Sequence, residues 1–101
     1  MPITASKIPF TETNINRVPQ SSGVYGLYDQ SYNTIYYGMS ESDIRGRLLA
    51  HFNGKSGTCQ KNAVYISWEL TKDAVQKEKD LIAEHKRQNN GKLPKCNEVH
   101  P

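Results

Sequence analysis

The chain has 101 residues, of which 36% are apolar, and its 13 Lys and Arg residues outnumber its 10 Asp and Glu residues. This length suits one domain with a small core, and no run of about 18 apolar residues is present to cross a membrane. The first residues also lack the apolar stretch of a secretory signal, so we expect a cytoplasmic protein with no membrane contact.

The N-terminal half predicts an irregular segment followed by a hairpin. Residues 1–22 are polar and contain three prolines, which leaves room for at most one helical turn near residues 12–17. The segments 23–28 and 34–37 are rich in β-branched and aromatic residues, and turn residues separate them. These two segments predict a β-hairpin.

The C-terminal half predicts two helices with a strand between them. Several N-cap residues precede a helix that ends near Phe52, although Gly46 weakens it by roughly 1 kcal/mol relative to alanine. Residues 63–68 predict a third strand, and residues 72–89 predict a long helix that stops at Asn90 and the glycine after it. The remaining residues are short and extended.

The predicted order is strand, strand, helix, strand, helix. It predicts an α+β fold, with a small three-stranded antiparallel sheet flanked by helices. We assign residues 1–18 to an irregular lead-in and residues 19–101 to a single domain.

Two cysteines, Cys59 and Cys96, lie far apart in the chain, with no CxxC pair and no cluster of Cys and His around them. Cytoplasmic proteins keep their thiols reduced, and a structural zinc site needs four suitably spaced ligands. We therefore expect two reduced cysteines, with neither a disulfide nor a zinc site.

The charges are unevenly placed along the chain. Between residues 44 and 68 there is no Asp or Glu, but there are four basic residues and one histidine: Arg45, Arg47, His51, Lys55 and Lys61. Such a stretch either faces a polyanion or forms a solvated surface whose acidic partners lie elsewhere, and charge alone leaves both interpretations open. Further on, basic and acidic residues alternate, which is typical of an exposed helix with ion pairs.

The long helix carries a carboxylate in the middle of its apolar face. At about 100° per residue, Glu78 projects between Leu81 and Ile82. A carboxylate in that position is costly unless a cation or hydrogen-bond donors meet it. Two interpretations remain, namely a buried ion pair with an Arg or Lys, and a ligand for a hard cation such as Mg²⁺.

The shorter helix carries Arg47 and His51 one turn apart, along the edge of its buried face. Arg45 lies nearer the apolar side, but in the first turn, where its long side chain can reach solvent. Taken alone, this arrangement is more typical of a polar rim than of a functional site.

The predicted hairpin contains two short motifs of glycine and tyrosine, Gly23-Val24-Tyr25 and Tyr36-Tyr37-Gly38. They resemble the two signature tripeptides of the GIY-YIG nuclease family, the first with Val in place of Ile and the second with Tyr in the middle. The match covers roughly residues 19–98 and continues through residues on both helices and near the C-terminus: Ile44, Arg47, His51, Glu78, Leu81, Ile82 and Asn97. Met39 departs from the pattern, because many relatives have Lys there.

The resemblance implies a divalent-metal-dependent endonuclease that hydrolyses phosphodiester bonds of nucleic acid, most of all DNA. It implies that Glu78 binds one Mg²⁺ or Mn²⁺ and that Arg47 neutralises the scissile phosphate. Tyr25 and Tyr36 would lie beside the attacking water, and His51 would hold or activate a tyrosine. Three further matches would support the site: Gly23, Gly38 and Asn97.

Tyrosine is an awkward general base, because its usual pKa of about 10 leaves it protonated at neutral pH. We therefore expect Arg47, His51 and the cation to make proton loss from Tyr25 easier.

Two other functions compete with catalysis on the same fold, an inactive nucleic-acid-binding module and a protein-interaction module. The intact set of site residues favours the enzyme. The expected additional contacts to nucleic acid are Arg45, Lys55 and Lys61. Because so small a domain covers few phosphates, we expect a modest, salt-dependent affinity. Specificity would then come from a second copy of the chain, a separate targeting subunit or an unusual DNA shape.

Overall fold

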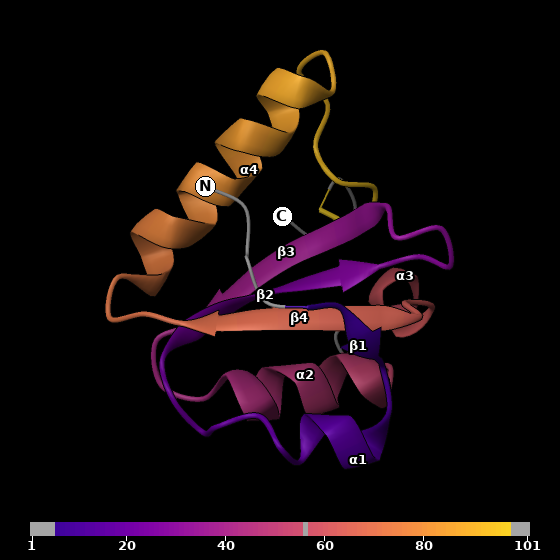
Figure 1. The fold of residues 1–101 in the computed structure, drawn as a ribbon, viewed down its shortest axis with the longest axis vertical. Coiled ribbons are helices and arrows are strands. Elements are labelled where there is room, and N and C mark those ends of the chain that lie inside the picture. Colours follow the sequence, from indigo (N-terminus) through magenta and orange to yellow (C-terminus); the bar gives the residue numbers. More distant parts are fainter. Residues whose placement is uncertain (1–5, 56, 98–101) are drawn as a thin grey trace.

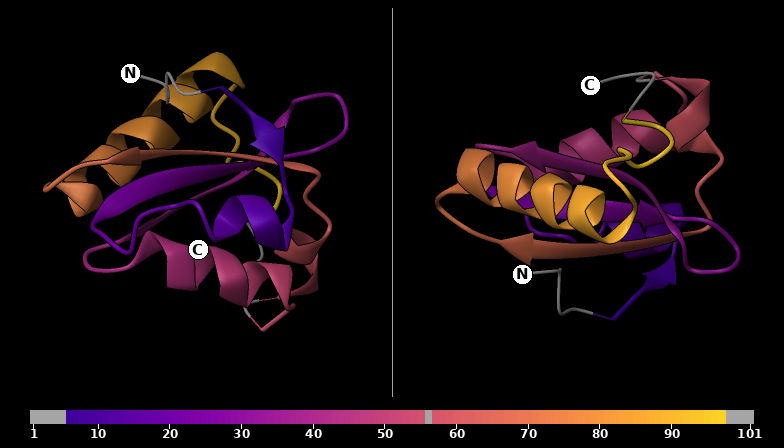
Figure 2. Two further views of the ribbon diagram at one scale, coloured as in Figure 1. Left: turned by 60° about the horizontal axis from the view of Figure 1, so that its bottom comes forward. Right: turned by 90° about the horizontal axis from the view of Figure 1, so that it is seen from above.

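The computed structural model describes residues 6–55 and 57–97 (Figure 1). In chain order its elements are β1 (Ile8–Pro9), α1 (Glu12–Ile15), β2 (Gly23–Tyr28), β3 (Thr34–Ser40), α2 (Ile44–Phe52), α3 (Thr58–Lys61), β4 (Tyr65–Leu70) and α4 (Ala74–Gln88). The sheet is the middle layer, with α4 on one face and α1 and α2 on the other (Figure 2). None of these described helices is both long and apolar enough to cross a bilayer.

The antiparallel sheet has the strand order β1-β4-β2-β3. β2 is central, and all of its residues are buried. The predicted α+β fold is confirmed, but the sheet has four strands instead of three, because β1 pairs with β4. The segment expected to be irregular therefore supplies an edge strand and the predicted helical turn. A two-residue strand that contains a proline has no alternation by which a sequence could reveal it.

The predicted hairpin, the two longer helices and the third predicted strand all form. β2 and the end of α2 lie where the sequence predicted them, and other ends are shifted. β3 continues to Ser40 instead of stopping at residue 37, because its last residues pair with the start of β2. Gly38 consequently lies inside the strand, opposite Tyr25. β4 begins and ends two residues later than predicted.

The larger of two hydrophobic clusters lies between the sheet and helices α1 and α2. It consists mainly of aliphatic side chains that are fully buried: Ile15, Val18, Leu27, Ile44, Leu48 and Ile66. At the start of α2, Asp43 Oδ1 accepts a hydrogen bond from the Gly46 amide at 3.0 Å. A Cβ atom at position 46 would lie 2.6 Å from the Asp43 carboxylate, so this helix-weakening glycine makes room for the cap.

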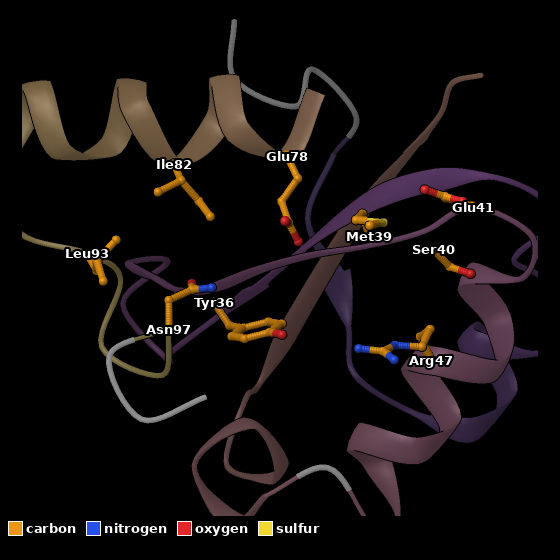
Figure 3. A pocket seen from close by; sticks show the side chains of 9 residues that line it. All are labelled: Tyr36, Met39, Ser40, Glu41, Arg47, Glu78, Ile82, Leu93 and Asn97. Carbon is orange, nitrogen blue, oxygen red and sulfur yellow. The ribbon is translucent and has the colours of Figure 1, made fainter. Parts of the chain in front are cut away.

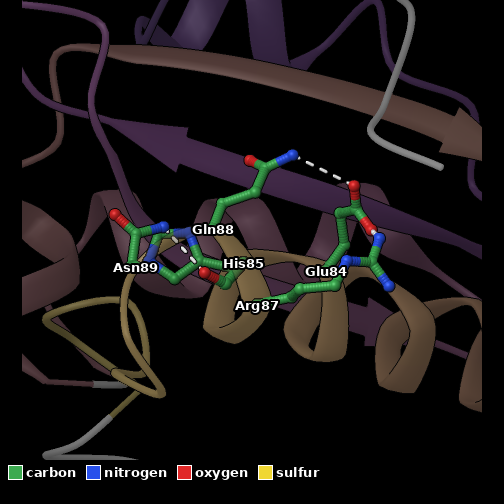
Figure 4. Close-up of polar contacts among 5 residues, drawn as sticks. All are labelled: Glu84, His85, Arg87, Gln88 and Asn89. Carbon is green, nitrogen blue, oxygen red and sulfur yellow. Dashed lines mark hydrogen bonds and ion pairs between the residues drawn. The ribbon is translucent and has the colours of Figure 1, made fainter.

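Helix α4 covers the β3 side of the other sheet face. Its Leu81 and Ile82 pack against Val24, Tyr37 and Met39 in a second, smaller cluster. The opposite side of α4 carries the expected mixture of charges, and Figure 4 shows the polar contacts of its last turns. There an ion pair joins Arg87 to Glu84. The side-chain amides of Gln88 and Asn89 each donate a hydrogen bond to the residue four positions earlier, Glu84 and His85.

After α4 the chain reverses through Asn90 and Gly91, which have φ angles of 58° and 83°. This left-handed conformation ends helices and favours asparagine and glycine, as the sequence predicted. Residues 92–97 then return toward β3 (Figure 1).

Cys59 of α3 and Cys96 form a disulfide, with their Cα atoms 5.6 Å apart. The expectation of two reduced cysteines is wrong. The contact depends on α3, which the sequence did not predict, and on the return of the chain after α4, so the spacing of the cysteines could not reveal it. A bond between residues 37 positions apart stabilises a fold by about 3 to 4 kcal/mol.

Candidate active site

The two signature tyrosines lie side by side on the α2 face of the hairpin. The ring centroids of Tyr25 and Tyr36 are 6.3 Å apart, and both rings belong to the larger cluster. Gly38 makes room for them, because a Cβ atom there would lie 2.5 Å from the Tyr25 hydroxyl oxygen and 2.7 Å from Cε2 of Tyr36. The glycine of the second tripeptide thus permits both phenols to occupy their positions.

His51 lies behind the two tyrosines. Its Nε2 atom is 2.7 Å from the Tyr25 hydroxyl oxygen, and its ring centroid is 5.2 Å from that of Tyr36. Both His51 and Tyr25 are almost completely buried. A single hydrogen bond, shielded from solvent, therefore connects the phenol of Tyr25 with the imidazole.

The two phenols share an environment that keeps them protonated. Burial raises the pKa of Tyr25 well above the usual range, Tyr36 raises it further, and Arg47 lowers it by less. Burial also raises the pKa of Tyr36, again against the influence of Arg47. In the free protein desolvation outweighs the nearby guanidinium, so the pKa of Tyr25 is raised on balance. Arg47 acts in the expected direction, and easier proton loss from Tyr25 with the cation bound stays a prediction.

Arg47 extends from α2 toward the same hydroxyl groups. Interaction with the Tyr25 hydroxyl raises the pKa of Arg47, and Tyr36 adds to the effect. Its guanidinium points into an open pocket that Tyr36 also lines (Figure 3). Arg47 therefore connects the buried pair of Tyr25 and His51 with a space that a ligand can enter.

Glu78 enters the pocket from α4, on the opposite side of the edge strand β3 (Figure 3). Burial raises the pKa of its carboxyl group, and Arg47 lowers it. Within the described residues Glu78 forms neither a hydrogen bond nor a close ion pair, so Arg47 acts on it only at longer range. The inward direction predicted from the helical period is correct, whereas a close buried ion pair does not form.

The pocket has a volume of about 460 Å³. Ile82 and Leu93 lie at one end, and Arg47 lies at the other with Ser40 and Glu41 (Figure 3). Between them are the remaining lining residues: Tyr36, Met39, Glu78 and Asn97. This volume is typical of a site for a small ligand or for part of a larger one.

Asn97 reaches the pocket from the C-terminal segment and bonds to the outer edge of β3. Its Oδ1 atom accepts the Tyr37 amide at 2.9 Å, and its Nδ2 atom donates to the Tyr37 carbonyl at 3.0 Å. The amide of Cys96 donates to the Ile35 carbonyl at 2.7 Å. The side-chain amide of Asn97 thus makes the two hydrogen bonds that a neighbouring strand would make.

The other candidate residues lie outside this pocket. Arg45 Nε donates to the Val18 carbonyl at 2.6 Å, which ties α2 to the segment after α1. Lys55, which follows α2, and Lys61, the last residue of α3, are both exposed to solvent. Gly23 allows β2 and β4 to approach, because a Cβ atom there would lie 2.5 Å from the Glu69 carbonyl oxygen.

The donor set fits one hard divalent cation. No three His, Cys, Asp or Glu side chains gather within residues 6–55 and 57–97. Mg²⁺ is usually held by one or two carboxylates, with water and substrate phosphate as its other ligands. Glu78 offers one carboxylate that has no close partner among the described residues, and the open pocket leaves room for those other ligands.

A family model described as the GIY-YIG catalytic domain matches residues 21–92. The chain belongs to the GIY-YIG family. Its domain therefore has a nuclease fold, which is generally that of a metal-dependent endonuclease. A search of curated proteins returned no match. The matched part of the GIY-YIG domain includes both tripeptides, Arg47, His51 and Glu78, and it ends before Cys96 and Asn97.

Sequence reasoning missed one end of the GIY-YIG pocket. Ser40 and Glu41 lie at its rim because β3 continues past Gly38, where the sequence prediction ended the strand. The available signal was Met39, an apolar residue two positions after Tyr37. Leu93 had none, because its position depends on the reversal after α4.

Proposed function

We propose that this GIY-YIG protein is a divalent-cation-dependent endonuclease that hydrolyses phosphodiester bonds of nucleic acid, with DNA as its main substrate. The observation that supports this proposal is the placement of Glu78 and Arg47 in one open pocket beside Tyr36 (Figure 3). An in-line displacement at a phosphodiester builds negative charge on the phosphate oxygens. A cation on the Glu78 carboxylate and the Arg47 guanidinium opposite it would stabilise this negative charge from two sides.

Glu78 would hold a single Mg²⁺ or Mn²⁺ ion, which when bound supplies positive charge at the phosphate and leaving oxygens. Arg47 binds the scissile phosphate through its planar fork of N–H donors and stabilises the charge that grows there. The Tyr36 hydroxyl, which lies at the pocket wall, orients the attacking water. Gly38 supports these roles by leaving space for the two phenols.

The water gives up its proton to the Tyr25 oxygen while Tyr25 passes its own proton to Nε2 of His51. The hydrogen bond of 2.7 Å between them supports this route. Both phenols are protonated in the free protein, so the transfer belongs to the hydrolytic step itself. The oxygen of the new P–O bond stays on the 5′-phosphate. The P–O3′ bond breaks, and the leaving oxygen takes a proton from solvent water to become a 3′-hydroxyl, while His51 later returns its extra proton to solvent.

The partner is nucleic acid, with Lys55 and Lys61 as expected contacts outside the pocket. Arg45, the third basic residue that the sequence suggested, donates to the Val18 carbonyl and acts on the fold instead. Since one pocket covers few phosphates, a second copy of the chain or a separate targeting subunit would supply specificity. The cytoplasm is the location that the composition favours, and the disulfide is the observation that speaks against it.

The test is cleavage of labelled duplex, flap, branched and single-stranded DNA, and of RNA, with Mg²⁺, Mn²⁺ or chelator. We compare the wild type with Glu78→Gln and with Glu84→Gln, a matched change on α4 at a residue that pairs with Arg87 away from the pocket. We expect metal-dependent nicking that Glu84→Gln keeps and Glu78→Gln loses.

Nicking that persists in chelator or in Glu78→Gln would refute the proposed role of this carboxylate. Binding without nicking by all three proteins would identify a nucleic-acid-binding module instead.

A further inference from the structure

Residues 92–97, which we call the strap, form one wall of the pocket without belonging to a helix or strand. They follow the reversal at Asn90 and Gly91 and run along the outer edge of β3 (Figure 1). Leu93 and Asn97, near the two ends of the strap, both line the pocket. The position of this wall therefore depends on what holds the strap against β3.

Three hydrogen bonds join the strap to β3, and all are at its far end. The amide of Cys96 bonds to Ile35, and both polar atoms of the Asn97 side chain bond to Tyr37. Six residues of irregular chain lose backbone entropy when they are ordered on β3. Each hydrogen bond to β3 replaces one to water, so its net stabilisation is small by comparison. Three hydrogen bonds alone therefore stabilise the bound position of the strap only weakly.

The disulfide supplies a covalent anchor at the same end of the strap. Cys96 directly precedes Asn97 and is fully buried, and its sulfur is bonded to Cys59 of α3. α3 packs beside α2, the helix that carries Arg47 and His51. The bond therefore connects the α2 side of the pocket with the residue next to Asn97. Cys59 lies within residues 21–92, the part that matches the family model, whereas Cys96 lies beyond it.

We propose that the disulfide between Cys59 and Cys96 is a positioning device for the active site, which holds the Asn97 amide on Tyr37 and thereby fixes the strap and β3 around the pocket. Tyr36, whose hydroxyl lies in the pocket, directly precedes Tyr37 in β3. Cys59 and Cys96 are thus positioning residues. The part of this inference that concerns turnover rests on the proposed endonuclease function.

Opening the bond is a balanced exchange with a dithiol. Dithiothreitol gives two electrons and two protons to the disulfide, so that the S–S bond breaks and two thiols form, while the reagent closes to its own cyclic disulfide. The freed strap keeps its hydrogen bonds to β3 and the buried side chain of Pro94, but it loses its covalent anchor. We expect it to leave the edge of β3 for much of the time, which exposes the Tyr37 amide to water.

The first test is amide hydrogen exchange, which requires no catalysis. We compare the oxidised protein, the same protein reduced and alkylated, and the Cys59→Ser/Cys96→Ser variant, each at low temperature. Exchange of the Tyr37 amide should become at least tenfold faster without the disulfide. The amide of Tyr25, in the central strand β2, should keep its protection and so report an intact fold.

Unchanged exchange at Tyr37 would overturn the proposal. Loss of protection at both Tyr37 and Tyr25 would overturn it as well, because the disulfide would then stabilise the whole fold and not the strap. These outcomes are independent of whether the protein cleaves nucleic acid, so a failure of the proposed function leaves this test intact.

The second test is turnover with a substrate found by the cleavage panel. Reduction should lower kcat at least fivefold and change KM by less than twofold, because Arg47 still binds the phosphate. Reoxidation should restore the wild type but not the double serine variant. In an Asn97→Ala background, opening the disulfide should cause no further loss, whereas independent, additive losses would contradict a role that acts through Asn97.

Discussion

Desolvation governs the individual side chains of the candidate site. Tyr25, Tyr36 and Glu78 all have a pKa raised first of all by burial, and Arg47 opposes the shift in each case. In the free protein the site is therefore biased toward neutral forms. Burial makes the carboxyl group of Glu78 and the phenol of Tyr25 difficult to ionise, and a bound cation would favour their charged forms. We therefore expect the site to bind a cation before it acts.

Tyr25→Phe should lower kcat by about 10² to 10⁴, the usual contribution of a general base, because it removes the hydroxyl group that is bonded to Nε2 of His51. Single-turnover cleavage from pH 6 to pH 9 measures the effect. The matched control is Tyr28→Phe, which also removes a buried hydroxyl with a hydrogen bond, to Ser67 on the α4 face of the sheet, outside the pocket. Full activity of Tyr25→Phe at all these pH values would exclude Tyr25 as the base.

Glu78→Gln should raise the melting temperature at pH 7 in the absence of divalent cations. The folded state raises the pKa of Glu78, so its ionised form destabilises the fold, and this cost disappears as the pH falls through the raised pKa. The gain over the wild type should therefore shrink on acidification. Thermal unfolding from pH 5 to pH 8 checks it, with Glu84→Gln as the control. A Glu78→Gln protein less stable than the wild type at pH 7 would contradict the argument.

At the scale of helices and strands, local patterns predicted most of the fold. Strand-forming and turn residues predicted the hairpin, and the helical period predicted that Glu78 faces the inside of the molecule. Three features had no local signal: β1, which exists only through pairing with β4; α3, which is a single turn; and the disulfide, which depends on α3. Gly38 was interpreted as the end of a strand, although its function is to leave space for two tyrosine rings.

Gly38→Ala should abolish most cleavage, because its methyl group would overlap with the rings of Tyr25 and Tyr36. Overpacking of this kind also costs about 1 to 3 kcal/mol of unfolding free energy. Gly26→Ala is the matched control on the same hairpin, since its methyl group would meet the ring of Tyr28 on the other face. Urea unfolding and cleavage assays should show similar losses of stability but loss of activity only in Gly38→Ala. Equal activity of the two variants would refute this role of Gly38.

At the scale of the whole molecule, the pocket spans the edge of the sheet. α2 brings Arg47 from one face and α4 brings Glu78 from the other, while β3 and the strap close the space between them (Figure 3). The order of these residues in the chain carried the family resemblance. It could not reveal that they meet around an edge strand, because that depends on the packing of both helices.

The three basic residues outside the pocket should separate into two classes. Arg45→Gln should cost about 1 to 2 kcal/mol of unfolding free energy and leave the salt dependence of binding unchanged, because Arg45 is bonded to the Val18 carbonyl. The double change Lys55→Gln/Lys61→Gln should reduce the slope of log Kd against log salt by about 2, with no loss of stability. Titrations of a labelled duplex at several salt concentrations measure the slopes. An unchanged slope in the lysine variant would remove both residues from the interface.

The Asn97 amide on Tyr37 has a further consequence for how copies of this chain can associate. Exposed sheet edges invite strand addition, which leads to swapped dimers and fibrils. One border of this sheet ends in the two residues of β1, where Pro9 lacks an amide proton, and on the other border the side chain of Asn97 occupies both polar groups of Tyr37. Any assembly of copies of this chain should therefore be built through helices or loops, and not by extension of the sheet.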